Sequence, residues 1–196
     1  MYVEYEATFA NVDKKQVRDK LKKIGGKLLK AEFLQRRITF SVPENTFKHS
    51  WARVRDESDR VTMSFKANTG NGINDQKEIE LIIDNFQKGV DFLKKLGCKK
   101  KSYQETKREI WDLERTKIFI DEWPFVPPFV EIEGTSEKEV KIISEKLGFN
   151  YAEALFCPVG TIYSKQYGVS EKIINNEIPK ITFDMKNPFI KFLKNN

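Results

Sequence analysis

The sequence Phe129–Gly134, FVEIEG, alternates acidic and apolar residues, and this alternation decides the fold that we expect. In a β-strand successive side chains point to opposite faces, so Glu131 and Glu133 project to one side while Ile132 projects to the other. The same pattern occurs twice more, at Glu4–Glu6 and at Glu78–Glu80. One such pair fits an ordinary surface strand, but three pairs indicate a shared role for the glutamates.

Each acidic strand is followed by a segment whose apolar residues have helical spacing and which ends at a glycine. The apolar positions and glycines are Val17, Leu21, Ile24 and Gly25; Phe86, Val90, Leu93, Leu96 and Gly97; and Val140, Ile143, Leu147 and Gly148. The third helix begins with a capping box, Ser136 to Glu139. We expect the helices to cover the apolar sides of the strands, at Val3, Ile79 and Ile132, and to leave the six glutamates on the opposite side.

Length and composition favour one soluble domain that attracts polyanions. The chain has 196 residues, a formal net charge of +6 and a pI near 9.1. It has no apolar run of membrane-spanning length and no signal-peptide pattern, and Cys98 and Cys157 fit a reducing cytoplasm. The lysines at 94–95 and 99–101 indicate solvated helix ends, because no aromatic residues interleave with them as nucleic-acid binding would require.

The remaining strands are expected at 35–42, 51–56, 61–66, 103–113 and 116–121. Arg53 and Arg55 share one face of their strand, and Lys66 shares a face with Thr62 and Ser64. We therefore predict an α+β fold, a closed or nearly closed eight-stranded antiparallel barrel with helices packed outside. The barrel domain is expected over 1–168, with a helix broken near Pro158, and an irregular C-terminal extension over 169–196.

The interior of this barrel would be strongly charged. Like charges about 4 Å apart repel by ~4 kcal/mol at an intermediate dielectric, so the acidic cluster is unstable alone. Divalent cations, together with a polyanion held by the arginine and lysine side, would neutralise it. The residues thus predict a site for phosphate and metal. The only histidine, His49, lies in the polar loop 44–50 and carries no role in this site.

From Val3 to about Gly148 the chain resembles the CYTH superfamily, the triphosphate tunnel metalloenzymes, and most closely its class IV adenylyl cyclase-like branch. The motifs that carry the resemblance are the N-terminal ExE, Arg53 and Arg55, Lys66, the central ExE, Arg108, Asp121, and the EIE of Glu131 and Glu133. The resemblance implies a tunnel that binds a triphosphate with Mg²⁺ or Mn²⁺. The implied metal ligands are Glu4, Glu6, Glu131 and Glu133, with Asp121 completing or orienting the set. The implied phosphate clamp is Arg53, Arg55, Lys66 and Arg108, and Glu78 and Glu80 would hold a second metal or support the clamp.

Two residues depart from the family pattern. Thr8 stands where the ExExK signature has lysine, and Arg37 stands where an acidic residue is usual, which adds a fifth candidate for phosphate binding. The expected function is processing of a nucleoside triphosphate or inorganic triphosphate by a monomer or homodimer in the cytoplasm, with catalysis by Glu4, Glu6 and the clamp. Cyclisation and hydrolysis stay open, and the alternative is a binding module that has lost turnover together with the lysine.

Overall fold

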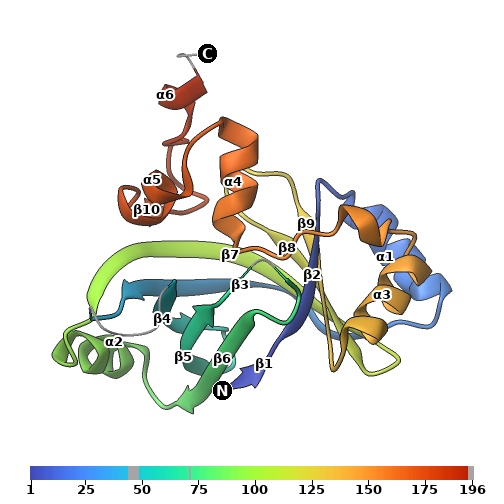
Figure 1. Ribbon diagram of the computed structural model, residues 1–196, viewed down its shortest axis with the longest axis horizontal. Coiled ribbons are helices and arrows are strands. Elements are labelled where there is room, and N and C mark those ends of the chain that lie inside the picture. The colour runs from blue at the N-terminus through green and yellow to red at the C-terminus, as the bar shows by residue number, and fades with distance from the viewer. Residues whose placement is uncertain (44–48, 71, 194–196) are drawn as a thin grey trace.

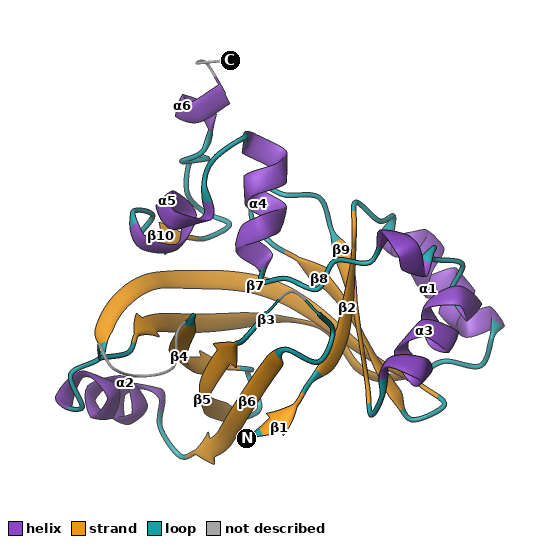
Figure 2. Ribbon diagram, in the orientation of Figure 1, coloured by secondary structure: helices purple, strands orange, loops and turns teal. Residues whose placement is uncertain are grey.

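The structure is a computed structural model of the 196-residue chain, and it describes residues 1–43, 49–70 and 72–193. The predicted loop at 44–50 therefore lies mostly outside the described residues. One antiparallel sheet dominates the fold, with the first three helices of the chain on its outer side (Figures 1 and 2). Its strands are β1 (Tyr2–Val3), β2 (Tyr5–Ala10), β3 (Lys27–Ser41), β4 (Ser50–Asp56), β5 (Val61–Asn68), β6 (Gln76–Ile83), β7 (Lys99–Leu113), β8 (Thr116–Glu122), β9 (Phe129–Gly134) and β10 (Lys180–Ile181).

The sheet curls into a half-barrel that is open. Hydrogen-bonded neighbours follow the order β1-β6-β5-β4-β3-β7-β8-β9-β2. The two ends of this order, β1 and β2, are consecutive parts of the N-terminal segment, with Glu4 between them. Tyr2 is opposite Glu78 of β6, whereas Glu6 is opposite Glu133 of β9, so this segment spans the gap between the two edges. The antiparallel strands and their curl are as predicted, but the barrel is open and not closed.

The three predicted helices are present as α1 (Lys14–Lys23), α2 (Phe86–Lys95) and α3 (Glu137–Lys146). Each is followed by its expected glycine in the left-handed region, with φ of 88°, 88° and 87° at Gly25, Gly97 and Gly148. At the start of α3 the Glu139 N–H donates to Ser136 Oγ at 3.3 Å, which confirms that half of the capping box. The Glu139 carboxylate accepts a hydrogen bond from the Thr135 N–H at 2.8 Å, one residue before the N–H that a capping box would use.

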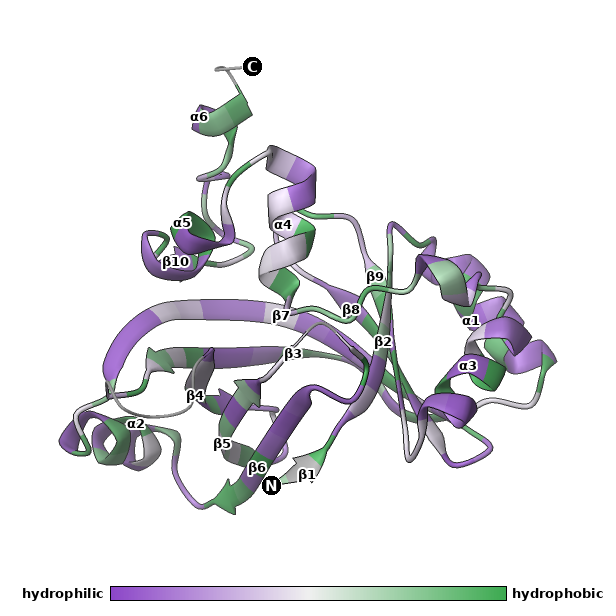
Figure 3. Ribbon diagram, in the orientation of Figure 1, coloured by the Kyte–Doolittle hydropathy of each residue, from purple (hydrophilic) through white to green (hydrophobic). Residues whose placement is uncertain are grey.

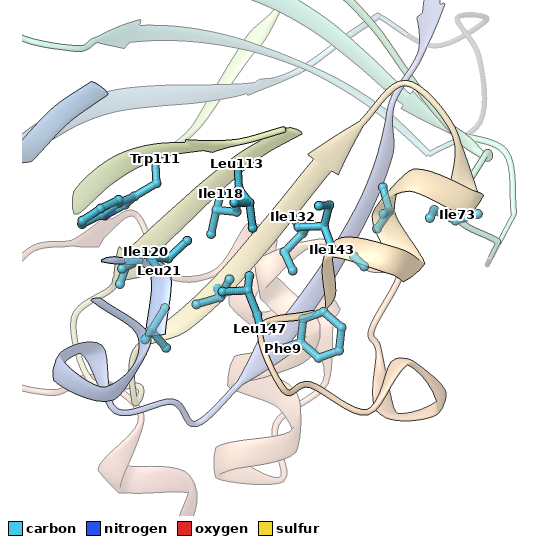
Figure 4. Close-up of a cluster of buried hydrophobic side chains, with 14 residues drawn as sticks. Phe9, Leu21, Ile73, Trp111, Leu113, Ile118, Ile120, Ile132, Ile143 and Leu147 are labelled. Atoms are coloured by element: carbon cyan, nitrogen blue, oxygen red, sulfur yellow. The ribbon is translucent and has the colours of Figure 1, made fainter. Parts of the chain in front are cut away.

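The main hydrophobic core lies between α1, α3 and the outer faces of β2, β8 and β9 (Figure 4). Leu21 from α1, Ile143 from α3 and Ile118 and Ile132 from the sheet meet there, and none is more than 2% exposed. A second cluster forms where Val90 and its neighbours in α2 pack on β3 and β4. The acidic strand Phe129–Gly134 thus has its apolar side in the core, as its alternation predicts.

Another part of the outer face is not covered. Val3 is 37% exposed, Ile79 is 44% exposed and Leu81 is 53% exposed, so the prediction that helices cover Val3 and Ile79 is wrong. The reason lies in the path of α2, which leaves β6 and packs against β4 and β5. Figure 3 shows the hydrophobic arrowhead end of β6.

The C-terminal part of the chain is more ordered than the predicted irregular tail, which is a correction. A short 3₁₀ helix, η1 (Tyr151–Glu153), precedes α4 (Val159–Tyr167), so the predicted break near Pro158 is confirmed. Then follow α5 (Glu171–Asn176), β10 and α6 (Ile190–Leu193). We call residues 159–181, which hold α4, α5 and β10, the C-terminal cap. The division of the chain at residue 168 stays a prediction.

Apolar burial explains why this segment is ordered. Ile174, Ile178, Ile181 and Phe189 are at most 5% exposed and pack in one cluster with Trp123 and other residues of the sheet side. β10 also adds two parallel pairings to β7. In Figure 1 the cap stands on the opposite side of β7 from β4, β5 and β6. None of the described helices is long and apolar enough to cross a membrane.

The contrast between two isoleucines tests this packing. Ile132 is fully buried and Ile79 is 44% exposed, although each is bracketed by two glutamates. Ile132→Ala should lower the free energy of unfolding by about 2–5 kcal/mol, because it leaves a cavity in the core. The matched variant Ile79→Ala should lower it by roughly 1 kcal/mol or less. Urea denaturation of both variants measures the difference, and equal losses would contradict the packing described here.

Candidate functional site

The concave side of the sheet holds a cavity of about 960 Å³. Strand alternation brings nearly all of the predicted site residues into its lining. Those that line it are Glu4, Glu6, Arg37, Arg53, Arg55, Lys66, Glu78, Glu80, Arg108, Glu131 and Glu133. Asp121 is the exception, since it is 1% exposed and lies behind the cavity wall. The roles assigned to these residues stay predictions, and the structure establishes their placement.

One wall of the cavity pairs the arginines of β4 with the glutamates of β6. Arg53 Nη2 lies 3.3 Å from Glu78 Oε1 and 3.7 Å from Glu80 Oε2. Arg55 Nη2 lies 3.3 Å from Glu80 Oε2 and also pairs with Glu57. Both glutamates therefore hold the arginines in position. This arrangement fits the predicted role of Glu78 and Glu80 as support for the clamp.

Arg37 has no carboxylate partner among the described residues. Its Nη2 donates to Gln35 Oε1 at 2.9 Å and to Thr106 Oγ1 at 2.5 Å, and its guanidinium lies 4.7 Å from the centre of the Trp123 ring. Burial lowers the pKa of Arg37 well below its usual value, and repulsion from the neighbouring arginines adds to this effect. Because a guanidinium stays protonated in proteins, the lowered pKa marks a positive charge that an anion would stabilise.

Lys66 of β5 joins the wall formed by β4 and β6, which we call the basic wall, to the N-terminal segment. Its Nζ lies 2.8 Å from Glu4 Oε2 and 3.1 Å from Glu78 Oε2. Gln76 Nε2 donates to the same Glu4 oxygen at 2.6 Å. Burial raises the pKa of Glu4 to about 7, helped by its contact with Glu78. The pKa of Glu78 moves the other way: burial opposes the shift, but the Glu4 contact and the Lys66 charge lower it. Of these two carboxyl groups, Glu4 therefore takes up a proton more readily than Glu78.

The acidic wall is formed by β2 and β9, where Glu6 is opposite Glu133. Burial raises the pKa of Glu6 well above its usual value, and the charge of Glu131 raises it further. Burial likewise raises the pKa of Glu133. These carboxylates repel one another inside the sheet, so a cation placed between them would be stabilised.

Arg108 sits between Asp121 and Glu131. Its Nε donates to Asp121 Oδ1 at 2.7 Å, and its Nη2 pairs with Asp121 Oδ2 and with Glu131. The guanidinium also lies 4.3 Å from the centre of the Phe119 ring. A two-point contact from a buried carboxylate fixes the plane of the guanidinium. Asp121 therefore orients Arg108, and its carboxylate does not line the cavity.

The donor set suits a hard divalent cation, since such ions take carboxylate oxygens. Within residues 1–43, 49–70 and 72–193, however, no three Asp, Glu, His or Cys side chains are gathered as a ready-made metal cage. Two of the carboxylates are engaged by cations instead, Glu4 by Lys66 and Glu131 by Arg108. These ion pairs would have to rearrange for a metal to enter. The carboxylates thus have the right chemistry to bind a divalent metal. In this structure their positions are set by ion pairs with Lys66 and Arg108.

Several residues of the site were not predicted from the sequence. Glu57 is 3% exposed and accepts from Arg60 Nε at 2.7 Å while it pairs with Arg55. Glu57 directly follows the last residue of β4, so its position two residues after Arg55 extends the alternation of that strand by one residue and was a usable signal. The cap also lines the cavity, through Thr161, Glu171, Asn175 and Asn176 among others. No repeated pattern in the sequence indicated this contribution.

Thr8, the departure from the lysine of the family signature, is 3% exposed and does not line the cavity. Its backbone N–H donates to Leu155 O at 3.0 Å, and its carbonyl accepts from Leu155 N–H at 2.9 Å. The chain that leads from η1 into α4 therefore lies along this edge of β2. At this position the backbone of β2 pairs with the C-terminal part of the chain, and the Thr8 side chain is buried.

The fold and the site together define a class of protein in which an open half-barrel encloses a charged cavity. Residues 3–153 match the family model of the CYTH domain, and the chain belongs to this family. The resemblance seen in the motifs is thereby confirmed. The matched region ends before α4, so the C-terminal cap lies outside it.

Similar proteins agree with this assignment. MJ0240 of Methanocaldococcus jannaschii, provisionally named an adenylate cyclase, is 31% identical over 147 residues, which are 74% of this chain and 81% of that protein. A Vibrio parahaemolyticus structure with a similar provisional name has a TM-score of 0.70 at 12% identity and covers 83% of this chain and 98% of its own. HpAC1 from Hippeastrum has a TM-score of 0.55 at 13% identity, with coverages of 85% and 97%. At these identities the two structures show the shared fold.

The raised pKa of Glu4 predicts how the stability of the metal-free protein depends on pH. The folded state keeps the Glu4 proton up to about pH 7, whereas the unfolded chain releases it near pH 4.5. The free energy of unfolding should therefore fall as pH rises from 4.5 to 7. Glu78, whose pKa is lowered, acts only below this window.

Denaturation with a chelator present, repeated across this pH window, tests the assignment. Glu4→Gln removes the titrating group while it keeps the size of the side chain, so this variant should lose part of the slope. Glu114→Gln, in the exposed turn between β7 and β8, is the control and should keep the slope. A Glu4→Gln variant with an unchanged slope would show that other groups cause the pH dependence.

Proposed function

We propose that this protein is a metal-dependent enzyme that processes a triphosphate bound in its charged cavity. One observation carries the proposal. Arg37, Arg53 and Arg55 are each at most 9% exposed, and the Nε of each is buried without a hydrogen-bond partner among the described residues. An unsatisfied buried donor costs about 1–3 kcal/mol, and the three arginines that carry these donors line one cavity. A ligand rich in acceptor oxygens would suit their positively charged guanidinium groups.

Phosphate oxygens suit these donors, because guanidinium groups bind them through forked, charge-assisted hydrogen bonds. Lys66 and Arg108 add two further cations that carboxylates hold in place. A cavity of about 960 Å³ also falls in the range of small-molecule sites. The proposed phosphate clamp consists of Arg37, Arg53, Arg55, Lys66 and Arg108.

The proposed Mg²⁺ or Mn²⁺ ligands are Glu4, Glu6, Glu131 and Glu133. A divalent ion bound there would neutralise phosphate charge during the reaction. Asp121 would act through Arg108, whose guanidinium it orients. Glu78 and Glu80 would hold the arginines of β4, or take part in binding a second metal.

Two reactions can use this site. In hydrolysis water attacks the terminal phosphorus, and in cyclisation the ribose 3′-hydroxyl attacks the α-phosphorus and pyrophosphate leaves. The relatives support both, since all three carry provisional adenylate cyclase names and the Hippeastrum protein is also described as having a dominant triphosphatase activity. Free cysteines at 98 and 157 suit the reducing cytoplasm, where triphosphates are available to a monomer or homodimer.

A second candidate function is binding without turnover. Thr8 favours it, since the family lysine is absent there and the buried threonine does not line the cavity. Such a protein would hold a nucleotide or polyphosphate through the same clamp. Binding assays are expected to give the same result for both functions, so turnover separates them.

The direct test measures phosphate release and cyclic AMP from ATP, and phosphate release from tripolyphosphate, each with Mg²⁺ and with Mn²⁺. Product formation that stops on chelation supports the enzyme. A rise in melting temperature with triphosphate but no product supports the binding module. Neither product nor a shift in melting temperature with any triphosphate would overturn both.

Arg55 and Arg36 offer a matched pair for the clamp. Arg55 lines the cavity, whereas the Arg36 side chain on the other face of the sheet is 51% exposed. Arg55→Ala should weaken triphosphate binding by ~1.5–3 kcal/mol, because it removes charged hydrogen bonds. Arg36→Ala should leave binding nearly unchanged. Calorimetric titration with tripolyphosphate and Mn²⁺ measures both, and equal effects would exclude a specific clamp.

Glu133→Gln separates metal binding from phosphate binding. The substitution keeps the size of the side chain and removes one negative charge from the acidic wall. Activity should fall by about tenfold or more, which corresponds to at least ~1.4 kcal/mol, and raising the metal concentration should restore part of it. Arg55→Ala should not recover with excess metal. Loss of activity in Glu133→Gln without any rescue would remove this glutamate from the metal ligands.

A further inference from the structure

The C-terminal cap closes one part of the cavity and is firmly attached to the sheet. Tyr163 Oη of α4 donates to Pro124 O at 2.7 Å, and Ser102 Oγ of β7 donates to Ile178 O at 2.9 Å. The cap therefore presents its lining residues from a fixed position. Pro158 to Thr161, at the start of α4, belong to that lining, together with three residues of α5.

The polar groups of the cap differ from those of the sheet. α4 and α5 line the cavity with a hydroxyl, a carboxylate and two amides, from Thr161, Glu171, Asn175 and Asn176. Thr161 Oγ1 donates to Glu171 Oε1 at 2.5 Å. The half-buried amide of Asn175 has no hydrogen-bond partner among the described residues, so its donor and acceptor are available to a ligand.

The Glu171 carboxylate makes the surface of the cap itself a poor place for phosphate. The Glu171 carboxylate stands beside the first turn of α4, where it offsets the positive end of the helix. The arginines that suit phosphate lie on β3, β4 and β7. A triphosphate should therefore bind along the sheet, and a neutral group with hydrogen-bond donors and acceptors should face the cap.

The two regions are close enough for one ligand. β10, which follows α5, pairs with Tyr103 and Gln104 of β7, and Gln104 is opposite Arg37 in the β3–β7 ladder. Only β7 therefore separates β10 of the cap from Arg37, the arginine of the clamp that has no carboxylate partner among the described residues. Ile110, another residue that lines the cavity, is six residues further along β7 than Gln104, which is about 20 Å at ~3.3 Å per residue.

We infer that the C-terminal cap binds the nucleoside part of the substrate, through Asn175 and Glu171, and thereby selects a nucleoside triphosphate over inorganic tripolyphosphate. This inference rests on the proposed function, since it assumes that the clamp holds the triphosphate. A base offers the neutral donors and acceptors that an amide and a carboxylate recognise. Inorganic tripolyphosphate has no such group and would leave the Asn175 amide unpaired.

The test compares two ligands that resist cleavage, the methylene-bridged analogues of ATP and of tripolyphosphate, by calorimetric titration with Mn²⁺. The wild type should bind the ATP analogue more tightly. Asn175→Ala should weaken binding of the ATP analogue roughly 2- to 10-fold, as for one lost hydrogen bond, and leave the Kd of the tripolyphosphate analogue unchanged. Glu171→Gln should also change only the ATP analogue. Lys172→Ala, on the exposed side of α5, is the control.

Each other outcome overturns the inference. Equal weakening of both ligands by Asn175→Ala would make the cap a structural element, and so would no weakening of either. A selective loss of the ATP analogue in Ile110→Ala, but not in Asn175→Ala, would place the nucleoside near Ile110 and away from the cap. A wild type that prefers tripolyphosphate would refute the cap inference and keep the proposed function. Binding of neither ligand would refute both.

Discussion

The constraint on which this structure depends is the burial of charge inside a curled sheet. Arg53, Lys66 and Glu78 are each at most 9% exposed, and removing such charges from water is costly unless each has a partner. The strands meet this requirement by register, since Lys66 is opposite Glu78 and Arg53 is near both glutamates of β6. The compensation is incomplete at two places, the arginine Nε groups and the acidic wall of β2 and β9. Ligands of opposite charge suit these two places.

The N-terminal segment joins the two walls. It pairs with β6 before Glu4 and with β9 after it, so the acidic wall and the basic wall face one cavity although the sheet is open. Glu4 lies at the change of partner and is held by Lys66 and Gln76. Its carboxylate contacts the basic side of the site, two residues before Glu6 reaches the acidic wall. Through this single short segment, the fold brings the candidate metal-binding carboxylates and the candidate phosphate-binding cations into one cavity.

Much of this arrangement was predictable, because strand alternation is local. It placed Glu131, Arg53 and Lys66 on one face, and helical spacing located α1, α2 and α3 together with their terminal glycines. What the sequence could not show depends on long-range packing. The exposure of Ile79 follows from the path of α2, and the position of Asp121 behind the cavity follows from its contact with Arg108. The order of the C-terminal cap depends on apolar residues spaced irregularly along the chain, which meet in one cluster only in the folded protein.

The two faces of the sheet carry separate tasks, and this separation explains how the protein tolerates an unstable interior. Ile132 belongs to the core under α1 and α3, whereas its neighbours Glu131 and Glu133 belong to the cavity. The core supplies stability without contact with the charged groups, so those groups can stay partly unpaired in the free protein. A ligand that satisfies them binds only the folded state, and its binding energy therefore adds to the stability of the fold. Residues that weaken the free protein are for this reason the ones best placed to bind.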